Sequence, residues 1–168
     1  MLARLVIDNF RSIKHLDIPL GPTNIFVGAN NSGKSTILEA LNILLGESYP
    51  SVRSFDDRDY HMREIANPIC ITAYLDAPIQ LKDVFGNPHN AWGYKAQLSR
   101  YKRRTSRAEA GDPKFDYTMI GVDGKDLQMI QRHASPRGKP FPQPVNVSNE
   151  HRSFSPLLYV GIDRNILS

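Results

Sequence analysis

One segment of the chain combines residue types that bind phosphate. Residues 28–35 match the pattern G-x-x-x-x-G-K-[ST] at every fixed position. Gly28 and Gly33 permit backbone angles that turn successive amide hydrogens inward, toward an anion. Lys34 can then carry positive charge to the β- and γ-phosphates, and the Ser35 hydroxyl is the expected Mg²⁺ ligand. The predicted nucleotide-binding residues of this segment are Gly28, Asn30, Asn31, Ser32, Gly33, Lys34, Ser35 and Thr36.

The phosphate loop alone does not identify the reaction, because switches, kinases and motors share it. A guanine-reading Asn-Lys-x-Asp motif is missing from the sequence, and the D-x-x-G match at residues 83–86 lies in a segment flanked by prolines. ATP is therefore expected rather than GTP, with Mg²⁺ as its companion ion. A compact kinase remains an alternative, in which the basic residues 100–107 imitate an arginine-rich lid.

Hydrolysis also requires an acidic side chain that holds Mg²⁺ at the end of a strand. Two apolar segments end in aspartate, at Asp76 and at Asp163, and neither is followed by glutamate. We place Asp163 ahead of Asp76 as the metal-bound aspartate, while a simple turn role is the alternative for both. A further acidic group consists of Asp56, Asp57, Asp59 and His61. Arginines are interleaved with that group, so a solvated loop is favoured over a metal site.

The elements around the phosphate loop follow from the apolar pattern. Residues 24–27 predict a short buried strand before the loop. Residues 34–45 predict a helix, ended by Gly46. The helix carries one apolar stripe, formed by Ile37, Leu38, Leu41, Leu44 and Leu45. The chain is thus expected to be an α/β P-loop protein.

Further elements are expected along the rest of the chain. Strands are predicted at residues 2–8, 16–20, 68–76, 94–102, 115–122 and 157–162. Loops are predicted at 47–66 and 77–93, and residues 126–133 fit either a hairpin arm or a short helix. Residues 134–156 contain five of the twelve prolines, which predicts a long and partly disordered loop.

Positive charge is concentrated in the middle of the chain. The net charge is +4, but residues 95–139 alone hold 11 Lys and Arg against 5 Asp and Glu. The densest basic positions are Arg100, Lys102, Arg103, Arg104 and Arg107. Such a patch favours a polyanion such as DNA, while a solvated strand edge is the alternative. Tyr101, between these cations, could stack on a base or pack on a neighbouring strand.

Composition limits the class of protein. The 168 residues are 40% hydrophobic and 23% charged, which is typical of one folded domain or one lobe of a larger protein. No apolar run approaches the roughly 20 residues that span a bilayer, and the N-terminus lacks a signal-peptide pattern. The single cysteine, Cys70, excludes an internal disulfide framework. A cytoplasmic protein without a membrane partner is expected.

The N-terminal third resembles a known superfamily. The segment Ile7-Asp8-Asn9-Phe10-Arg11-Ser12-Ile13-Lys14, a short strand, the phosphate loop and Glu39-Ala40-Leu41 follow one another in the order and spacing of ABC-type ATPases of the RecF, SMC and OLD kind. These proteins act in DNA repair, chromosome organisation and phage defence. The resemblance implies lobe I of such an ATPase, with strands 2–8 and 16–20 in an antiparallel β subdomain. It also implies that Arg11 lies near the nucleotide phosphates, although a surface turn residue is the alternative.

The sequence departs from this superfamily in its second half. The Leu-Ser-Gly-Gly-type signature, the Asp-Glu pair and the switch histidine of the second lobe are not found, and no catalytic residue can be assigned. We therefore expect residues 1–168 to be a first lobe without its second lobe, from a truncated gene, an expressed fragment or part of a longer protein. Such a lobe would bind ATP, and turnover would need the second lobe and a head-to-head dimer. OLD-type relatives carry a nuclease domain whose chemistry this sequence lacks. A non-catalytic nucleotide-gated interaction module is a third hypothesis.

Overall fold

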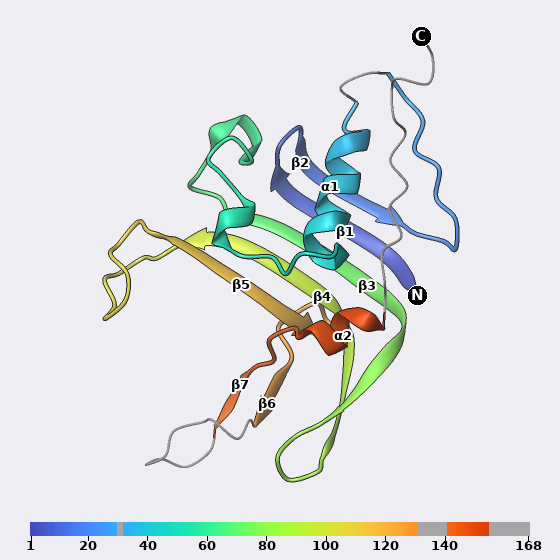
Figure 1. Cartoon of the computed structure of the whole chain (residues 1–168), viewed down its shortest axis with the longest axis vertical. Helices are drawn as coiled ribbons and strands as arrows, with labels where there is room; N and C mark the ends of the chain where they lie inside the picture. Colours follow the sequence, from blue (N-terminus) through green and yellow to red (C-terminus); the bar gives the residue numbers. More distant parts are fainter. Residues whose placement is uncertain (30–31, 131–140, 155–168) are drawn as a thin grey trace.

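The computed structural model describes residues 1–29, 32–130 and 141–154, and its largest element is a five-stranded antiparallel sheet (Figure 1). The strand order is β2-β1-β3-β4-β5. The strands are β1 (Leu2–Phe10), β2 (Ile13–Pro19), β3 (Ile69–Lys82), β4 (Pro88–Arg100) and β5 (Pro113–Ile120). The predicted strands near 2–8, 16–20, 68–76, 94–102 and 115–122 are thus confirmed, with shifted ends.

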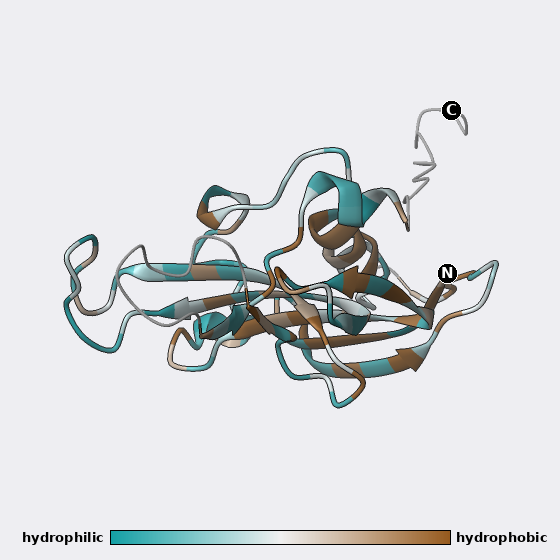
Figure 2. Ribbon diagram, turned by 90° about the horizontal axis from the view of Figure 1, so that it is seen from below, coloured by the Kyte–Doolittle hydropathy of each residue, from teal (hydrophilic) through white to brown (hydrophobic). Residues whose placement is uncertain are grey.

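The sheet has two chemically different faces, because successive side chains of a strand point to opposite sides. On the core face, Ile7 lies opposite Ile71, which lies opposite Ala96; all three are buried. On the polar face, the next register positions bring together Asp8, Cys70 and Gln97. Figure 2 shows the apolar colour concentrated in α1 and the strands beside it, whereas the loops are mostly hydrophilic.

Helix α1 (Lys34–Leu45) covers the core face, and its predicted bounds are confirmed. Its buried residues are Thr36, Ile37, Ala40, Leu41, Ile43, Leu44 and Leu45. The Tyr117 hydroxyl of β5 donates a hydrogen bond to the carbonyl of Leu44, which ties the last turn to the sheet. Gly46 is the C-cap residue, where the backbone turns to an extended conformation, and a Cβ there would lie 2.4 Å from the carbonyl oxygen of Asn42.

The predicted strand at residues 24–27 is wrong. No strand is assigned to this segment, and Ile25 and Val27 are 81% and 89% exposed. Only Phe26 packs against the core. A strand requires a partner for its backbone hydrogen bonds, and the described part of the chain places none beside this segment.

The predicted loop at residues 77–93 is also wrong, because β3 and β4 continue as a long hairpin through most of it. The pairing register shifts between Tyr74 and Ile79, and Pro78 lies inside that irregularity. A proline is tolerated there since a bulge needs no ladder hydrogen bond from it. Pro88, at the start of β4, takes the other tolerated position.

The C-terminal part of the described chain is more ordered than predicted. Strands β6 (Gln128–Ile130) and β7 (Pro142–Pro144) pair antiparallel, and α2 (Asn149–Ser153) follows. Residues 126–127 pair back onto β5, as the hairpin-arm alternative predicts, whereas β6 is a strand that pairs with β7 instead. The loop prediction for 134–156 is wrong at β7 and α2. Residues 131–140 and the predicted strand at 157–162 lie outside the described residues.

Segment 47–67 is a surface loop, as predicted, with the two short 3₁₀ turns η1 (Val52–Ser54) and η2 (His61–Arg63). Asp59 and Tyr60 are exceptions because they are buried. Tyr60 forms an isolated β-bridge with Phe10, at the end of β1. The loop is thereby attached to the turn between β1 and β2.

Candidate nucleotide-binding site

The phosphate loop leads directly into α1. Gly33 is the N-cap residue, with a φ of 90°, a left-handed conformation that favours glycine. Gly28 has a φ of 157°, which L side chains rarely adopt, and a Cβ there would lie 2.8 Å from Oγ of Ser32. Both fixed glycines of the motif thus have a structural reason. Asn30 and Asn31, predicted from the same motif, lie outside the described residues.

The Lys34 ammonium group lies across the loop. Its Nζ donates to the carbonyl oxygens of Gly28 at 2.6 Å and Ala29 at 2.5 Å, and is 3.3 Å from Oγ of Ser32. These partners are neutral, and the contacts are exposed to solvent. A phosphate group would therefore be a stronger partner for the ammonium group than the carbonyls it now contacts.

The N-terminus of α1 is suited to an anion. The first amides of a helix have no intrahelical acceptor, and the helix dipole adds partial positive charge there. No side chain caps this end of α1, and its first turn carries no acidic residue. With Lys34 beside it, this helix end can bind the phosphates of a nucleotide.

The two hydroxyl residues that follow Lys34 differ in their surroundings. Ser35 is exposed, and its hydroxyl has no hydrogen-bond partner among the described residues, so it can serve as a Mg²⁺ ligand. Thr36 is buried, and its Oγ1 lies 3.0 Å from Oγ of Ser12. Thr36 therefore joins α1 to the turn between β1 and β2.

That turn holds Arg11, whose φ is 51°. The Nε of Arg11 donates to Oδ1 of Asp59 at 2.7 Å, and its Nη2 lies 3.7 Å from a carboxylate oxygen of Glu39 on α1. The guanidinium group also lies over the ring of Phe10, 5.2 Å from the ring centroid, which is within the roughly 6 Å limit of a cation–π contact. Arg11 is thus held at the α1 side of the turn.

Sequence reasoning missed the partners that hold the turn in place. Asp59 accepts hydrogen bonds from both the Nε and the backbone amide of Arg11. His61 Nδ1 lies 2.9 Å from the carbonyl oxygen of Arg11. The only sequence signal for these contacts was the acidic group in segment 47–66, which was interpreted as solvated. The structure confirms that interpretation for Asp57, which is 75% exposed, but not for the buried Asp59.

Asp76, one of the two predicted metal-binding aspartates, is paired with another group of the chain. Asp76 binds the N-terminal ammonium group of the chain at 2.6 Å, and that hydrogen bond lowers the pKa of its carboxyl group. Asp163 lies outside the described residues. Within residues 1–29, 32–130 and 141–154, no cluster of three or more His, Cys, Asp or Glu side chains is arranged to hold a metal ion.

The basic residues are distributed over the end of β4 and the β4–β5 loop. Arg100 is engaged in the fold: it binds Asp57 at 2.7 Å and the carbonyl of Gly111 at 3.2 Å, and it lies over the ring of Tyr60. The loop that follows projects from the end of the sheet (Figure 1). Its exposed cations are Lys102, Arg103, Arg104 and Arg107. Of these, Arg104 is paired with Glu109 at 3.0 Å.

Comparisons with known proteins agree with a nucleotide site. Residues 1–129 match the family model of the AAA ATPase domain. An OLD nuclease from Thermus scotoductus is 43% identical over 79 residues, covering 46% of this chain and 15% of that protein. A DNA replication and repair protein RecF from Actinobacillus pleuropneumoniae serotype 5b is 48% identical over 52 residues, covering 30% and 14%. A RecF protein from Vibrio vulnificus gives the same identity and coverage. The matches thus span about 15% of the length of these relatives. No helix in the described part of the chain has the length and apolar composition to cross a membrane.

Proposed function

The chain belongs to the AAA ATPase domain family, and on that basis we propose that it is the ATP-binding lobe of an ATPase that acts in DNA transactions. The relatives that support the DNA context are a nuclease and proteins of DNA replication and repair. The roles of repair, phage defence and regulation of an OLD-type nuclease all fall within this proposal. Within this proposal, we assign the chain more specifically to lobe I of an ABC-type ATPase, and the five-stranded sheet would be the antiparallel subdomain of that lobe.

The N-terminus of α1 is the observation that carries the proposal. It presents uncapped amides, a left-handed Gly33 and the Lys34 ammonium group at one helix end. These groups would bind the β- and γ-phosphates, and the exposed Ser35 hydroxyl would hold Mg²⁺. The bound ion would supply charge neutralisation between the phosphates.

Arg11 is proposed as a second cation for the nucleotide. Its neighbour Ser12 contacts Thr36 of α1, and a Cβ on Gly33 would lie 3.5 Å from Oγ of Ser12. The Arg11 turn is therefore packed against the helix end that receives the phosphates. The Arg11 side chain is 40% exposed, and its contact with Glu39 at 3.7 Å is longer than its contact with Asp59 at 2.7 Å.

A second lobe and a second head are proposed to complete the hydrolytic site. Ile25 and Val27 alternate with Phe26, and both are exposed directly before the phosphate loop. An added strand from a second lobe would satisfy this backbone and bury both side chains. The lobe by itself is expected to bind ATP with little turnover, and a head-to-head dimer would provide the opposing catalytic surface.

Calorimetric titration tests the nucleotide assignment. Mg·ATP and Mg·GTP are titrated separately into the purified chain, and phosphate release is followed in parallel. We expect saturable ATP binding, much weaker GTP binding and negligible phosphate release. Equal binding of GTP would contradict the ATP assignment. Rapid phosphate release by the isolated chain would contradict the requirement for a second lobe.

A further inference from the structure

A groove runs along one end of the polar face of the sheet, and none of its lining residues belongs to the phosphate loop. It consists of two pockets of about 670 and 690 Å³ that share Pro68 and Gln97 in their walls. Each volume lies within the range of about 300–1,000 Å³ in which proteins bind small organic groups. Because the two pockets are adjacent, the groove can hold an elongated ligand with several units.

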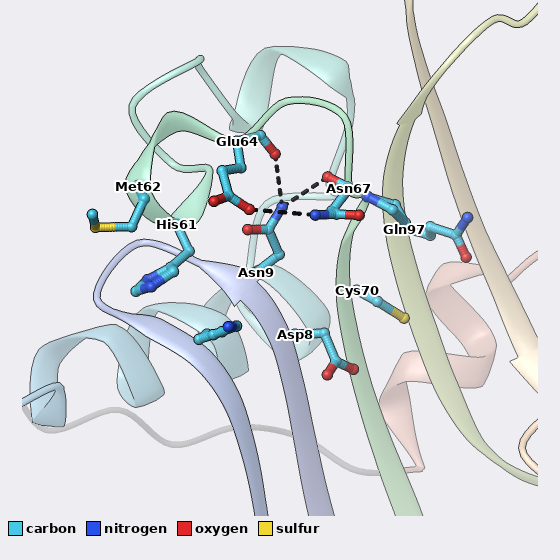
Figure 3. Close-up of a pocket in the computed structure, with 10 residues that line it drawn as sticks. Asp8, Asn9, His61, Met62, Glu64, Asn67, Cys70 and Gln97 are labelled. Atoms are coloured by element: carbon cyan, nitrogen blue, oxygen red, sulfur yellow. Dashed lines mark hydrogen bonds between the residues drawn. The ribbon is translucent and has the colours of Figure 1, made fainter.

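The first pocket is lined with groups that recognise polar ring edges. Asp8, Cys70 and Gln97 lie side by side on β1, β3 and β4 (Figure 3). Asn9 and Asn67 also line this pocket, and Nδ2 of Asn9 donates to the carbonyl oxygen of Asn67 at 2.7 Å. Carboxamides and carboxylates both pair with the donor and acceptor edges of nucleic-acid bases.

Gln97 stands between the two pockets with an unused hydrogen-bonding group. Its side chain is half-buried, and its carboxamide makes no hydrogen bond within the described residues. A carboxamide offers both donors and an acceptor, so a ligand in the groove could be bound by either. Its position makes Gln97 the centre of the groove.

The second pocket is basic and carries an aromatic side chain. Ser99 and Lys114 are register partners on β4 and β5, and Tyr101 and Lys102 follow at the end of β4. The ammonium group of Lys102 is exposed and has no ion-pair partner among the described residues. Lys114 binds Asp116 at 2.5 Å but is still 41% exposed. This end can therefore bind phosphates, with Tyr101 in place to stack on a base.

Two residues that line the first pocket have a backbone conformation that is uncommon for residues other than glycine. Asn9 has a φ of 54° and Met62 has a φ of 53°. Asn9, near the end of β1, holds the 60–67 loop through hydrogen bonds from its Nδ2 to the carbonyl oxygens of Glu64 and Asn67. These hydrogen bonds fix the position of the loop that forms part of the pocket wall.

We propose that this groove binds a single strand of nucleic acid, with phosphates at Lys102 and Lys114 and a base in the pocket beside Gln97. The proposal rests on the DNA context of the proposed function and assigns a surface to it. A single strand fits better than a duplex, because the base-recognising groups lie inside a recess where only an unpaired base can enter. The projecting arginines Arg103 and Arg104 would instead suit the outside of a duplex.

Fluorescence anisotropy with a labelled thymidine oligonucleotide tests the proposal. The oligonucleotide has about 16 nucleotides, which is the upper site size of single-strand grooves. A matched duplex is the comparison. Lys102→Ala with Lys114→Ala removes the phosphate contacts, and Gln97→Trp obstructs the groove without a change of charge. The control is the double variant Lys82→Ala with Lys125→Ala, which also removes two positive charges but at residues outside both pockets. Circular dichroism checks that every variant folds, and Mg·ATP titration checks the nucleotide site.

We expect the wild-type chain to bind the single strand more tightly than the duplex at low salt. The Lys102 and Lys114 variant should lose about tenfold in affinity, with a salt slope smaller by about 1.4, the value for two single-strand phosphate contacts. Gln97→Trp should also lose binding, while the control pair retains it. ATP binding should be unchanged in all of them.

Three results would contradict the proposal that the groove binds a single strand. They are equal losses in the control pair, full binding by a folded Gln97→Trp variant, or no oligonucleotide binding by the wild-type chain. If the wild-type chain binds ATP but no oligonucleotide, the proposal for the groove is wrong and the proposal for the nucleotide site is unaffected. Oligonucleotide binding without ATP binding refutes the proposed function instead. A Gln97→Trp variant that fails to fold is replaced by Gln97→Leu, which keeps the volume, removes the carboxamide and should still weaken binding.

Discussion

The Nε of Arg11 donates to Oδ1 of Asp59 at 2.7 Å, and this contact joins residues that are 48 positions apart in the chain. The Asp59 side chain is only 10% exposed and also accepts the backbone amide of Asp56 at 2.9 Å. Ser12, next to Arg11, contacts Thr36 of α1. These two contacts connect segment 47–67, the β1–β2 turn and the phosphate-loop end of α1. Asp59 therefore positions Arg11 although it lies in a loop.

Asp59→Asn should destabilise the protein. The amide cannot accept the same pair of hydrogen bonds, and Arg11 loses its closest counter-charge; a hydrogen bond to a charged group contributes about 1.5–3 kcal/mol. The measurement is the free energy of unfolding in urea. Asp57→Asn is the matched control, since that exposed carboxylate pairs with Arg100 and should cost only about 0–1 kcal/mol. Equal costs in both variants would contradict the positioning role of Asp59.

Lys34→Ala should reduce the affinity for Mg·ATP at least about tenfold, which corresponds to about 1.4 kcal/mol. The reason is the loss of a positive charge from the helix end that we propose as the phosphate site. Calorimetric titration gives the dissociation constant directly. Lys82→Ala, which removes an exposed charge at the end of β3, is the control and should bind ATP as the wild type does. Unchanged affinity in Lys34→Ala would show that the nucleotide binds elsewhere.

Tyr117→Phe should loosen the end of α1. The buried Tyr117 hydroxyl donates to the carbonyl of Leu44, one of the last carbonyls of the helix, which have no intrahelical donor. Leaving that carbonyl unpaired should cost about 1–3 kcal/mol. Urea unfolding measures the cost, and hydrogen exchange of the last turn of α1 should accelerate. Burial strongly raises the pKa of Tyr117, so the hydroxyl remains a donor up to alkaline pH. A variant as stable as the wild type would contradict this anchoring role.

Acid should weaken the cap of α2. The backbone amide of Ser148 donates to Nδ1 of His151 at 3.1 Å, and this contact needs an unprotonated ring nitrogen. Burial lowers the pKa of His151 below its usual 6.5. Since the unfolded chain binds the proton more readily, this contribution to stability is complete above about pH 6.5 and is lost as the pH falls toward the folded pKa.

The measurement is the free energy of unfolding in urea for the wild type and for His151→Gln, at several values between pH 7.5 and pH 5. The expected effect is about 1 kcal/mol, the usual contribution of one helix cap. Glutamine at this position can retain the capping box without titrating. The wild type should therefore lose stability relative to His151→Gln as the pH falls. A difference independent of pH would show that His151 does not titrate in this window.

Local interactions made part of the fold predictable. The bounds of α1 were correct because a helix forms its hydrogen bonds within one segment, and its apolar stripe and end signals are all adjacent in the sequence. Gly28, Gly33 and Lys34 were predictable for the same reason, since the phosphate loop is one continuous segment. The long β3–β4 hairpin was not, because Pro78 and Pro88 resemble loop residues unless the register of the pairing is known.

The sequence by itself determined the phosphate-loop motif, the helix behind it and the approximate positions of most strands along the chain. Tertiary structure alone decided that Asp59 is buried beside Arg11, that Arg100 is engaged with Asp57 and Tyr60, and that Gln97 stands between two pockets. It also left residues 24–27 without a strand partner in the described chain. The physical reason is the same in each case: a strand, a buried carboxylate or a groove wall acquires its partner from a distant segment, and periodicity carries no information about which segment that is.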